Sequence, residues 1–225
     1  MTEWWTYRLS SFLLFSPRTY FRLHELYNVE VWPLQLAGLV IGVVIIAMAF
    51  RAHSGRAVAG LLAVTWLFIA FAYHLRRYAT INWAATYFAA AFAVQAILLL
   101  WTGTIRQRLA FASRRRARQR IGFLVLLFAV FVQPAVALLA GRSLLQSEYF
   151  GVSPDPTITA TLGVLLLAHR SPWALWIVPL LWCAVSAAFQ SMMRSPDALI
   201  LPVVGVIAVA LAGAGRRSVE HVDAS

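Results

Sequence analysis

A few polar side chains stand out in a mostly apolar chain, and they gather in three short stretches. From these stretches we select ten candidate binding residues: His24, Glu25, Asn28, His74, Arg76, Arg77, Tyr78, Asn82, Asp155 and Thr157. Arginine beside histidine and asparagine can hold a carboxylate or a phosphate group through paired hydrogen bonds. The residue types therefore predict a site for a small polar or anionic solute.

The same arginines also allow a simpler interpretation. Arg76 and Arg77 can pair with Glu25, with Glu30 and with the phosphate groups of membrane lipids. Exposed ion pairs of this kind occur on many proteins without serving a specific ligand. The residue types alone leave both interpretations open.

Patterns for catalysis or metal binding are weak. The chain has no G-x-S-x-G turn, no H-E-x-x-H motif and no glycine-rich phosphate loop. Its single cysteine, Cys183, excludes an intramolecular disulfide and a thiolate metal cluster. The spacing of the histidines supports neither a metal held by His24 and His74 nor a haem held by His53 and His169. We therefore predict no intrinsic enzymatic activity and no metal site, and the sequence identifies no cofactor.

The composition places the chain among membrane proteins. Hydrophobic residues make up 61% of the 225 residues and charged residues only 12%, and the mean hydropathy is +0.75. The formal net charge is +11, but the basic residues lie in short segments beside apolar runs. Anionic lipid headgroups are nearer partners for them than nucleic acid. We predict contacts with membrane lipids and no nucleic-acid partner.

The elements that must position the candidate residues are helices that cross the membrane. A helix needs about 20 apolar residues to cross the hydrocarbon layer. We expect spans over residues 31–50, 57–73, 82–101, 121–140, 157–169, 173–190 and 198–214. This predicts an all-α transmembrane bundle over residues 31–215, with an N-terminal segment over 1–30 and a cytoplasmic tail over 216–225.

The N-terminal segment contains an amphipathic helix in our prediction. Ser16 and Pro17 form a typical helix start, with serine as the cap and proline in the first turn. Helical spacing gathers Tyr20, Leu23 and Tyr27 on one face, together with Leu26, and leaves Glu25 and Asn28 on the other. Such a helix is expected to lie at the membrane surface.

The direction of the spans follows from residues 106–120, which carry seven arginines and no acidic residue. The positive-inside rule places this segment in the cytoplasm, so the N-terminus faces outward and the C-terminus is cytoplasmic. The run at residues 157–169 is short, since 13 residues span only about 20 Å of the roughly 30 Å hydrocarbon layer. It either crosses or re-enters, and we favour crossing. Thr157, at its start, could serve an anion or bond back to its own helix.

Residues 12–33, 73–85 and 151–163 together resemble a family of uncharacterised bacterial inner-membrane proteins that are permease-like in hydropathy. The second stretch, YHLRRYATINWAA, is the most distinctive. The resemblance covers most of the chain and implies a multi-pass protein of the bacterial inner (plasma) membrane. It implies no substrate, reaction or catalytic residue.

Two functions fit these observations. The first is a small transporter or channel-type protein for a small polar or anionic solute, with its polar site on the outer face. The second is a non-catalytic membrane subunit that docks a protein partner, a lipid or a cofactor. Either one allows a homo-oligomer.

Overall fold

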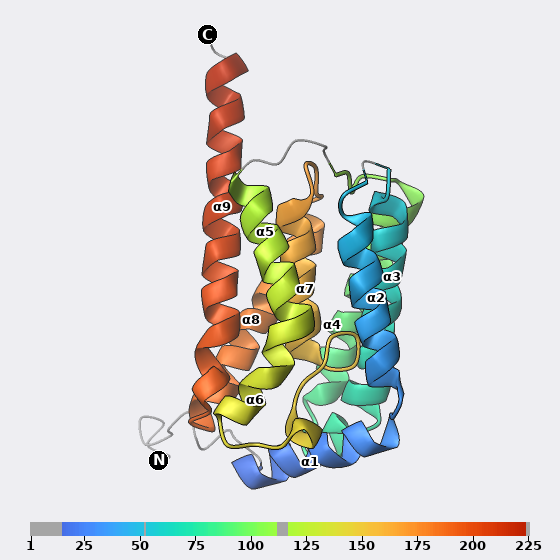
Figure 1. Ribbon diagram of the computed structural model, residues 1–225, viewed down its shortest axis with the longest axis vertical. Helices are drawn as coiled ribbons and strands as arrows, with labels where there is room; N and C mark the ends of the chain where they lie inside the picture. The colour runs from blue at the N-terminus through green and yellow to red at the C-terminus, as the bar shows by residue number, and fades with distance from the viewer. Residues whose placement is uncertain (1–14, 52, 112–116, 224–225) are drawn as a thin grey trace, which may run out of the picture.

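The computed structural model describes residues 15–51, 53–111 and 117–223, with side chains in the last helix as far as Gly213. In this part of the chain the regular structure is helical, and the helices form an elongated bundle (Figure 1). The prediction of an all-α membrane bundle is confirmed at this level.

The first helix, α1 (Pro17–Glu30), lies across one end of the bundle (Figure 1). It begins as expected, because the Ser16 hydroxyl accepts a hydrogen bond of 3.2 Å from the Thr19 backbone N–H. It meets α2 (Leu34–Met48) at 86°. The predicted buried face is wrong in part, since Leu26 is exposed while His24 and Asn28 are buried. These polar side chains turn inward because Tyr73 of the Gly55–Thr80 helix supplies a hydrogen-bond partner for His24, and the loop before α7 (Pro154–Leu167) supplies two for Asn28.

Five helical segments of the described chain are long and apolar enough to cross a membrane, or six if the bent pair α1 and α2 counts as one span. The five are Gly55–Thr80, Ala85–Ile105, Ala117–Leu139, Ala174–Met192 and Pro196–Gly213. They contain α3 (Gly55–Phe68), α4 (Ala85–Leu98), α5 (Ala117–Leu127), α6 (Val136–Leu139) and α8 (Ala174–Met192), and the last of them includes α9 (Ile200–Asp223) as far as Gly213. Helix α9 continues past residue 215, where we expected the bundle to end.

The short helix α7 (Pro154–Leu167) occupies the centre of the bundle, and each of its 14 residues is buried. It packs closely on α5, because a Cβ atom on Gly163 would lie only 2.8 Å from the Leu126 backbone nitrogen. Its C-terminal end leads to Arg170, which pairs with Ala110 next to the arginine-rich segment. The end of α7 is therefore close to the end of the bundle opposite α1 (Figure 1).

The loop before α7 enters the bundle from the α1 end (Figure 1). Gly38 of α2 leaves room for the loop, since a Cβ atom at this position would lie 2.2 Å from the carbonyl oxygen of Phe150. Gly151 completes the turn with φ +77°, a conformation that favours glycine. The loop thereby carries Glu148 and Asp155 inward, toward the buried start of α7.

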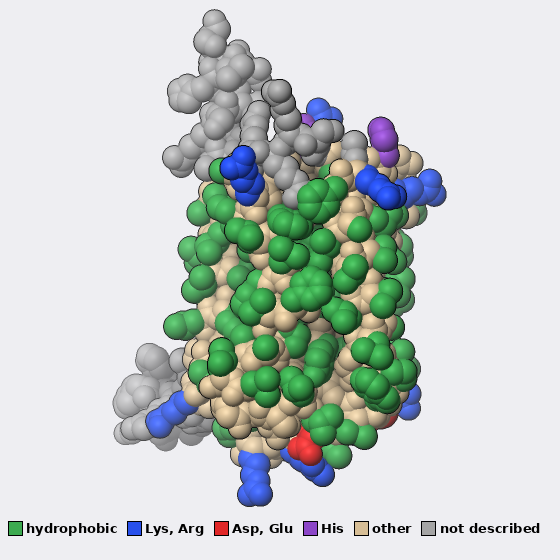
Figure 2. Space-filling model, viewed as in Figure 1, with side chains coloured by type: hydrophobic (Ala, Val, Ile, Leu, Met, Phe, Trp, Pro, Cys, Tyr) green, Lys and Arg blue, Asp and Glu red, His purple; other side chains and the backbone are tan. Residues whose placement is uncertain are grey.

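The outer surface fits a lipid environment. Figure 2 shows hydrophobic side chains over the length of the visible face, with arginine at its two ends. Exposed large apolar side chains include Val40, Leu67, Ile97, Leu124 and Leu181. A soluble protein rarely exposes so much apolar surface. By helix length and hydropathy the chain is a multi-pass membrane protein, and its candidate membrane helices contact lipid.

Candidate functional site

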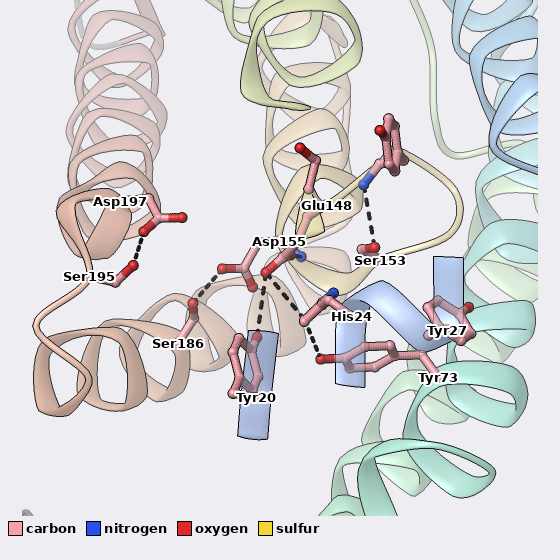
Figure 3. A network of polar contacts seen from close by, with 12 residues as sticks. Tyr20, His24, Tyr27, Tyr73, Glu148, Ser153, Asp155, Ser186, Ser195 and Asp197 are labelled. Atoms are coloured by element: carbon pink, nitrogen blue, oxygen red, sulfur yellow. Dashed lines mark hydrogen bonds and ion pairs between the residues drawn. The ribbon is translucent and has the colours of Figure 1, made fainter. Parts of the chain in front are cut away.

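A network of buried polar side chains lies between α1 and the rest of the bundle (Figure 3). The His24 ring nitrogen Nε2 is 2.9 Å from the Tyr73 hydroxyl and 3.8 Å from Oε1 of Glu148. The Tyr20 hydroxyl donates to the same Glu148 oxygen over 3.4 Å. Three distant segments of the chain therefore meet at Glu148.

Asp155 continues the network in the first turn of α7. Its carboxylate accepts hydrogen bonds from Trp182 Nε1 at 2.8 Å and from the Ser186 hydroxyl at 2.6 Å, both in α8. Its backbone N–H donates to Oε2 of Glu148 over 3.3 Å. The two acidic residues are thus linked through the start of α7, where the positive end of the helix dipole favours negative charge.

An ion pair closes the network on the α9 side. Arg142 Nη2 lies 2.5 Å from Oδ2 of Asp197, whose other oxygen accepts from Ser195. The Arg142 guanidinium also lies over the Phe21 ring, 4.4 Å from its centroid. Between this pair and the acidic residues is a cavity of about 20 Å³. Its lining residues are Gln133, Val136, Ala137, Arg142, Glu148, Asp155, Gln190, Asp197, Ile200 and Leu201.

Burial sets the protonation state of the groups outside the spans. Burial raises the pKa of Glu148 well above its usual value, and the neighbouring carboxylates of Asp155 and Asp197 raise it further, against the lowering effect of Arg142. Burial, followed by the charge of Arg142, lowers the pKa of His24 to about 3. His24 is therefore neutral at pH 7. A neutral His24 can accept the hydrogen bond from Tyr73.

A larger pocket, of about 790 Å³, runs along α1 on the side of Arg22 and Arg77, and we call it the arginine pocket. Three arginines and one acidic side chain line it, together with apolar and neutral residues. These charged residues are Arg18, Arg22, Glu25 and Arg77. Arg22 pairs with Glu25, and Arg77 pairs with Glu30. The pocket keeps an excess of positive charge, while Tyr20 and His24 of the same helix reach into the buried network.

The structure divides the ten predicted site residues among several places. His24 and Asp155 belong to the buried network, and Glu25 and Arg77 line the arginine pocket. Arg76 is exposed, with its guanidinium 5.7 Å from the centroid of the Phe71 ring. The prediction grouped residues that do not all share one site.

His74 and Tyr78 lie instead in a buried aromatic cluster. The His74 ring lies 4.5 Å from the Phe92 ring and 5.1 Å from the Trp182 ring, measured between centroids. Tyr78 packs on Phe15 and Phe88. Neither residue lines the arginine pocket or the small cavity.

Asn28, Asn82 and Thr157 form hydrogen bonds with the protein backbone. Asn28 donates to the carbonyl groups of Leu145 and Ser147, both at 2.8 Å. Asn82 accepts from the Ala84 N–H at 3.0 Å, at the start of α4. The Thr157 hydroxyl donates to the Ser153 carbonyl one turn earlier, over 2.9 Å, which is the alternative that the sequence left open.

Sequence reasoning missed Tyr73, Arg142, Glu148 and Asp197 as site residues. It also placed Asp155 in a polar cluster on the outer face, and the structure buries this residue, with only 8% exposed, between α7 and α8. The sequence contained one signal for Glu148. The apolar run of α7 is too short to cross a membrane unless the loop before it enters the bundle, and Glu148 lies in that loop, which leads directly into α7.

Among the described residues, no group of three or more histidine, cysteine, aspartate or glutamate side chains is arranged to hold a metal ion. No curated protein and no solved structure matches the chain. A family model does match, over residues 18–221, and its description is a family of unknown function, DUF6064. The match covers nearly the whole chain and includes α1, the entering loop and the network. The chain therefore belongs to the family of unknown function DUF6064.

Proposed function

We propose that the protein transports a small anionic or polar solute across the inner membrane of a bacterium. One observation carries this proposal. Helix α1 presents arginines to the pocket of about 790 Å³ on one face and places Tyr20 and His24 in the buried network on its other face. A helix in this position contacts both the proposed entry site and the polar interior. The interior groups also supply the ionisable side chains that transporters need within the bundle.

The charge of the pocket favours an anion. Three arginines against one glutamate leave a net charge of +2 on its lining, and the Arg77–Glu30 pair lowers the local charge to +1. Arginine binds carboxylate and phosphate groups in paired geometry, so these groups are the expected ligands. The volume of about 790 Å³ is within the range of sites for small organic ligands.

The proposal includes a threading of seven crossings, formed by α2, the helix that begins with α3, the helix that begins with α4, the α5–α6 segment, α7, α8 and α9. Helix α7 then completes its crossing with the help of the entering loop. This threading puts twelve arginines on the side of the 106–120 segment and seven on the side of α1. The imbalance supports an outer N-terminus and a cytoplasmic C-terminus.

The experiment is uptake by liposomes that contain the full chain. Radiolabelled acetate, phosphate and glutamate serve as probes, each offered outside at a range of concentrations. We expect one of them to enter faster than into protein-free liposomes. Arg22→Gln and Arg77→Gln should each raise the KM about tenfold, because each removes a charged hydrogen-bond donor.

The matched control is Arg51→Gln, which removes one exposed arginine in the turn between α2 and α3, at the other end of the bundle. It should leave the KM unchanged. If no probe enters faster than into protein-free liposomes, the transport proposal fails. An equal effect of all three substitutions would remove the pocket from the mechanism.

A second function, docking of a lipid chain or of an apolar partner segment, is favoured by a separate groove of about 610 Å³. The groove lies between α2 and the α5–α6 segment, and apolar side chains such as Trp32, Leu36, Leu39 and Phe131 line it. Phospholipid or a stoichiometric partner that remains with the purified chain, combined with absence of uptake, would select this function.

A further inference from the structure

The 20 Å³ cavity brings together buried polar atoms that have no protein partner. These atoms are Arg142 Nε, Gln133 Oε1 and Gln190 Oε1, and all three residues line the cavity. The two glutamines are only 8% and 4% exposed. An unpaired polar atom in such a place destabilises the fold, so a ligand that pairs with all three stabilises it.

The number and type of these atoms specify the ligand. One N–H donor and two carbonyl acceptors match a water molecule, which accepts one hydrogen bond and donates two. A cavity needs about 10–15 Å³ to hold a water, and this cavity has about 20 Å³. An organic solute does not fit in this volume.

The charges around the cavity specify what the water does. Glu148, Asp155 and Asp197 line it with only one cation, Arg142, and Arg142 is already paired with Asp197. Two further carboxylates therefore share a confined site, and like charges this close are not both ionised. Asp155 receives hydrogen bonds from Trp182 and Ser186 that stabilise its ionised form. Glu148 is thus the better proton acceptor.

We propose that the cavity binds one water molecule and that this water makes Glu148 a buried proton-binding site. The bound water turns one O–H group from a glutamine carbonyl toward Glu148. That O–H bond breaks as the carboxylate gains the proton, and the water takes a replacement proton from solvent, so no other bond changes. The titratable and charged groups around Glu148 are Tyr20 and His24 of α1, Tyr73 and Tyr78 of the helix that begins with α3, Arg142, Asp155 of α7 and Asp197. Burial, which raises the pKa of Glu148, agrees with this role.

One part of this inference rests on the proposed function, because it names the proton as the ion that is coupled to transport. Proton binding itself is measured without any flux. It can therefore hold where transport fails, or fail where transport holds.

The test is infrared difference spectroscopy of the full chain in lipid, recorded through a pH titration in H₂O and D₂O. The wild type should show the C=O band of a protonated carboxylic acid at pH 7. Glu148→Gln should lose this band. Glu25→Gln, which removes a carboxylate of α1 outside the cavity, should keep it. A wild type without the band at pH 7, or a band that survives Glu148→Gln, overturns the proposal.

The role of the water is tested on the same band. Gln133→Leu replaces one of its acceptors with an apolar group, so the water should leave the cavity. The ionised form of Glu148 then loses a hydrogen-bond donor, and its proton affinity should rise about tenfold, the equivalent of one lost hydrogen bond. An unchanged titration would overturn the water assignment. A thermal unfolding midpoint that rises in sodium chloride over choline chloride, and does so only when Glu148 is intact, would replace the water and proton with a sodium ion.

Discussion

At the scale of single residues, His24 shows how a polar side chain is kept neutral inside the protein. Only 1% of His24 is exposed, its Nε2 atom contacts the Tyr73 hydroxyl, and the nearby Arg142 opposes a second positive charge. Its pKa falls from 6.5 to about 3. The folded state therefore favours the neutral ring across the whole mildly acidic range.

This pKa shift predicts a loss of stability in acid. Between pH 6.5 and 3 the unfolded chain binds a proton at His24 and the folded chain does not, so the free energy of unfolding falls as the pH is lowered. From pH 7 to pH 5 the loss should be about 2 kcal/mol. Thermal unfolding in detergent at the two pH values measures it.

His24→Gln is the matched variant for this prediction. The glutamine amide can still accept from the Tyr73 hydroxyl but does not titrate. The variant should lose less stability than the wild type between pH 7 and pH 5. The proton on Glu148 affects both proteins, and its raised pKa favours the folded state at low pH, so the difference between the two proteins isolates His24. Parallel curves would contradict a neutral, buried His24.

At the scale of elements, the contact between α5 and α7 fixes the centre of the bundle. Gly122 and Gly163 lie opposite each other, and a Cβ atom on Gly122 would lie 2.7 Å from the Gly163 carbonyl oxygen. Helices that touch through small residues approach more closely than those with larger side chains. This approach holds the first turn of α7, and with it Asp155, at its place in the network.

Gly163→Ala should therefore destabilise the protein by about 1–3 kcal/mol, the usual cost of an extra group in a well-packed core. The new Cβ atom would lie 2.8 Å from the Leu126 nitrogen, so α5 and α7 have to separate. Gly60→Ala is the control, since its Cβ atom would meet only the Thr104 hydroxyl at 3.6 Å. Thermal midpoints in the same detergent compare the two. Equal midpoints would contradict the close packing.

At the scale of the whole molecule, polar and charged side chains occupy the two ends, and apolar side chains cover the middle (Figure 2). The arginine pocket and the buried network lie at the α1 end, and residues 106–111 and the start of α5 lie at the other end (Figure 1). Under the transport proposal, a solute that enters at α1 leaves at the end where α5 begins. The orientation in the membrane decides whether this direction is uptake or export.

Cysteine labelling in intact cells tests the orientation and the number of crossings. In a Cys183→Ala background, an exposed position at the α1 end, Ser143→Cys, should react with a membrane-impermeant maleimide. His53→Cys and Arg170→Cys should react only after the membrane is permeabilised, because the proposal puts both in the cytoplasm. The reverse pattern would invert the protein. Labelling of Arg170→Cys from outside would show that α7 does not cross.

The sequence alone determined the membrane class, the helical fold and the approximate positions of five of the seven expected spans, because hydropathy adds up along consecutive residues. It also located the start of α1 at Ser16, since the cap and the proline act within one turn. Only the tertiary structure decided which polar side chains meet. Glu148 reaches Tyr20 across 128 positions of sequence, and His74 lies among aromatic rings although it is two residues from Arg76. Such partners depend on how the helices and the entering loop pack, which no local pattern of residues specifies.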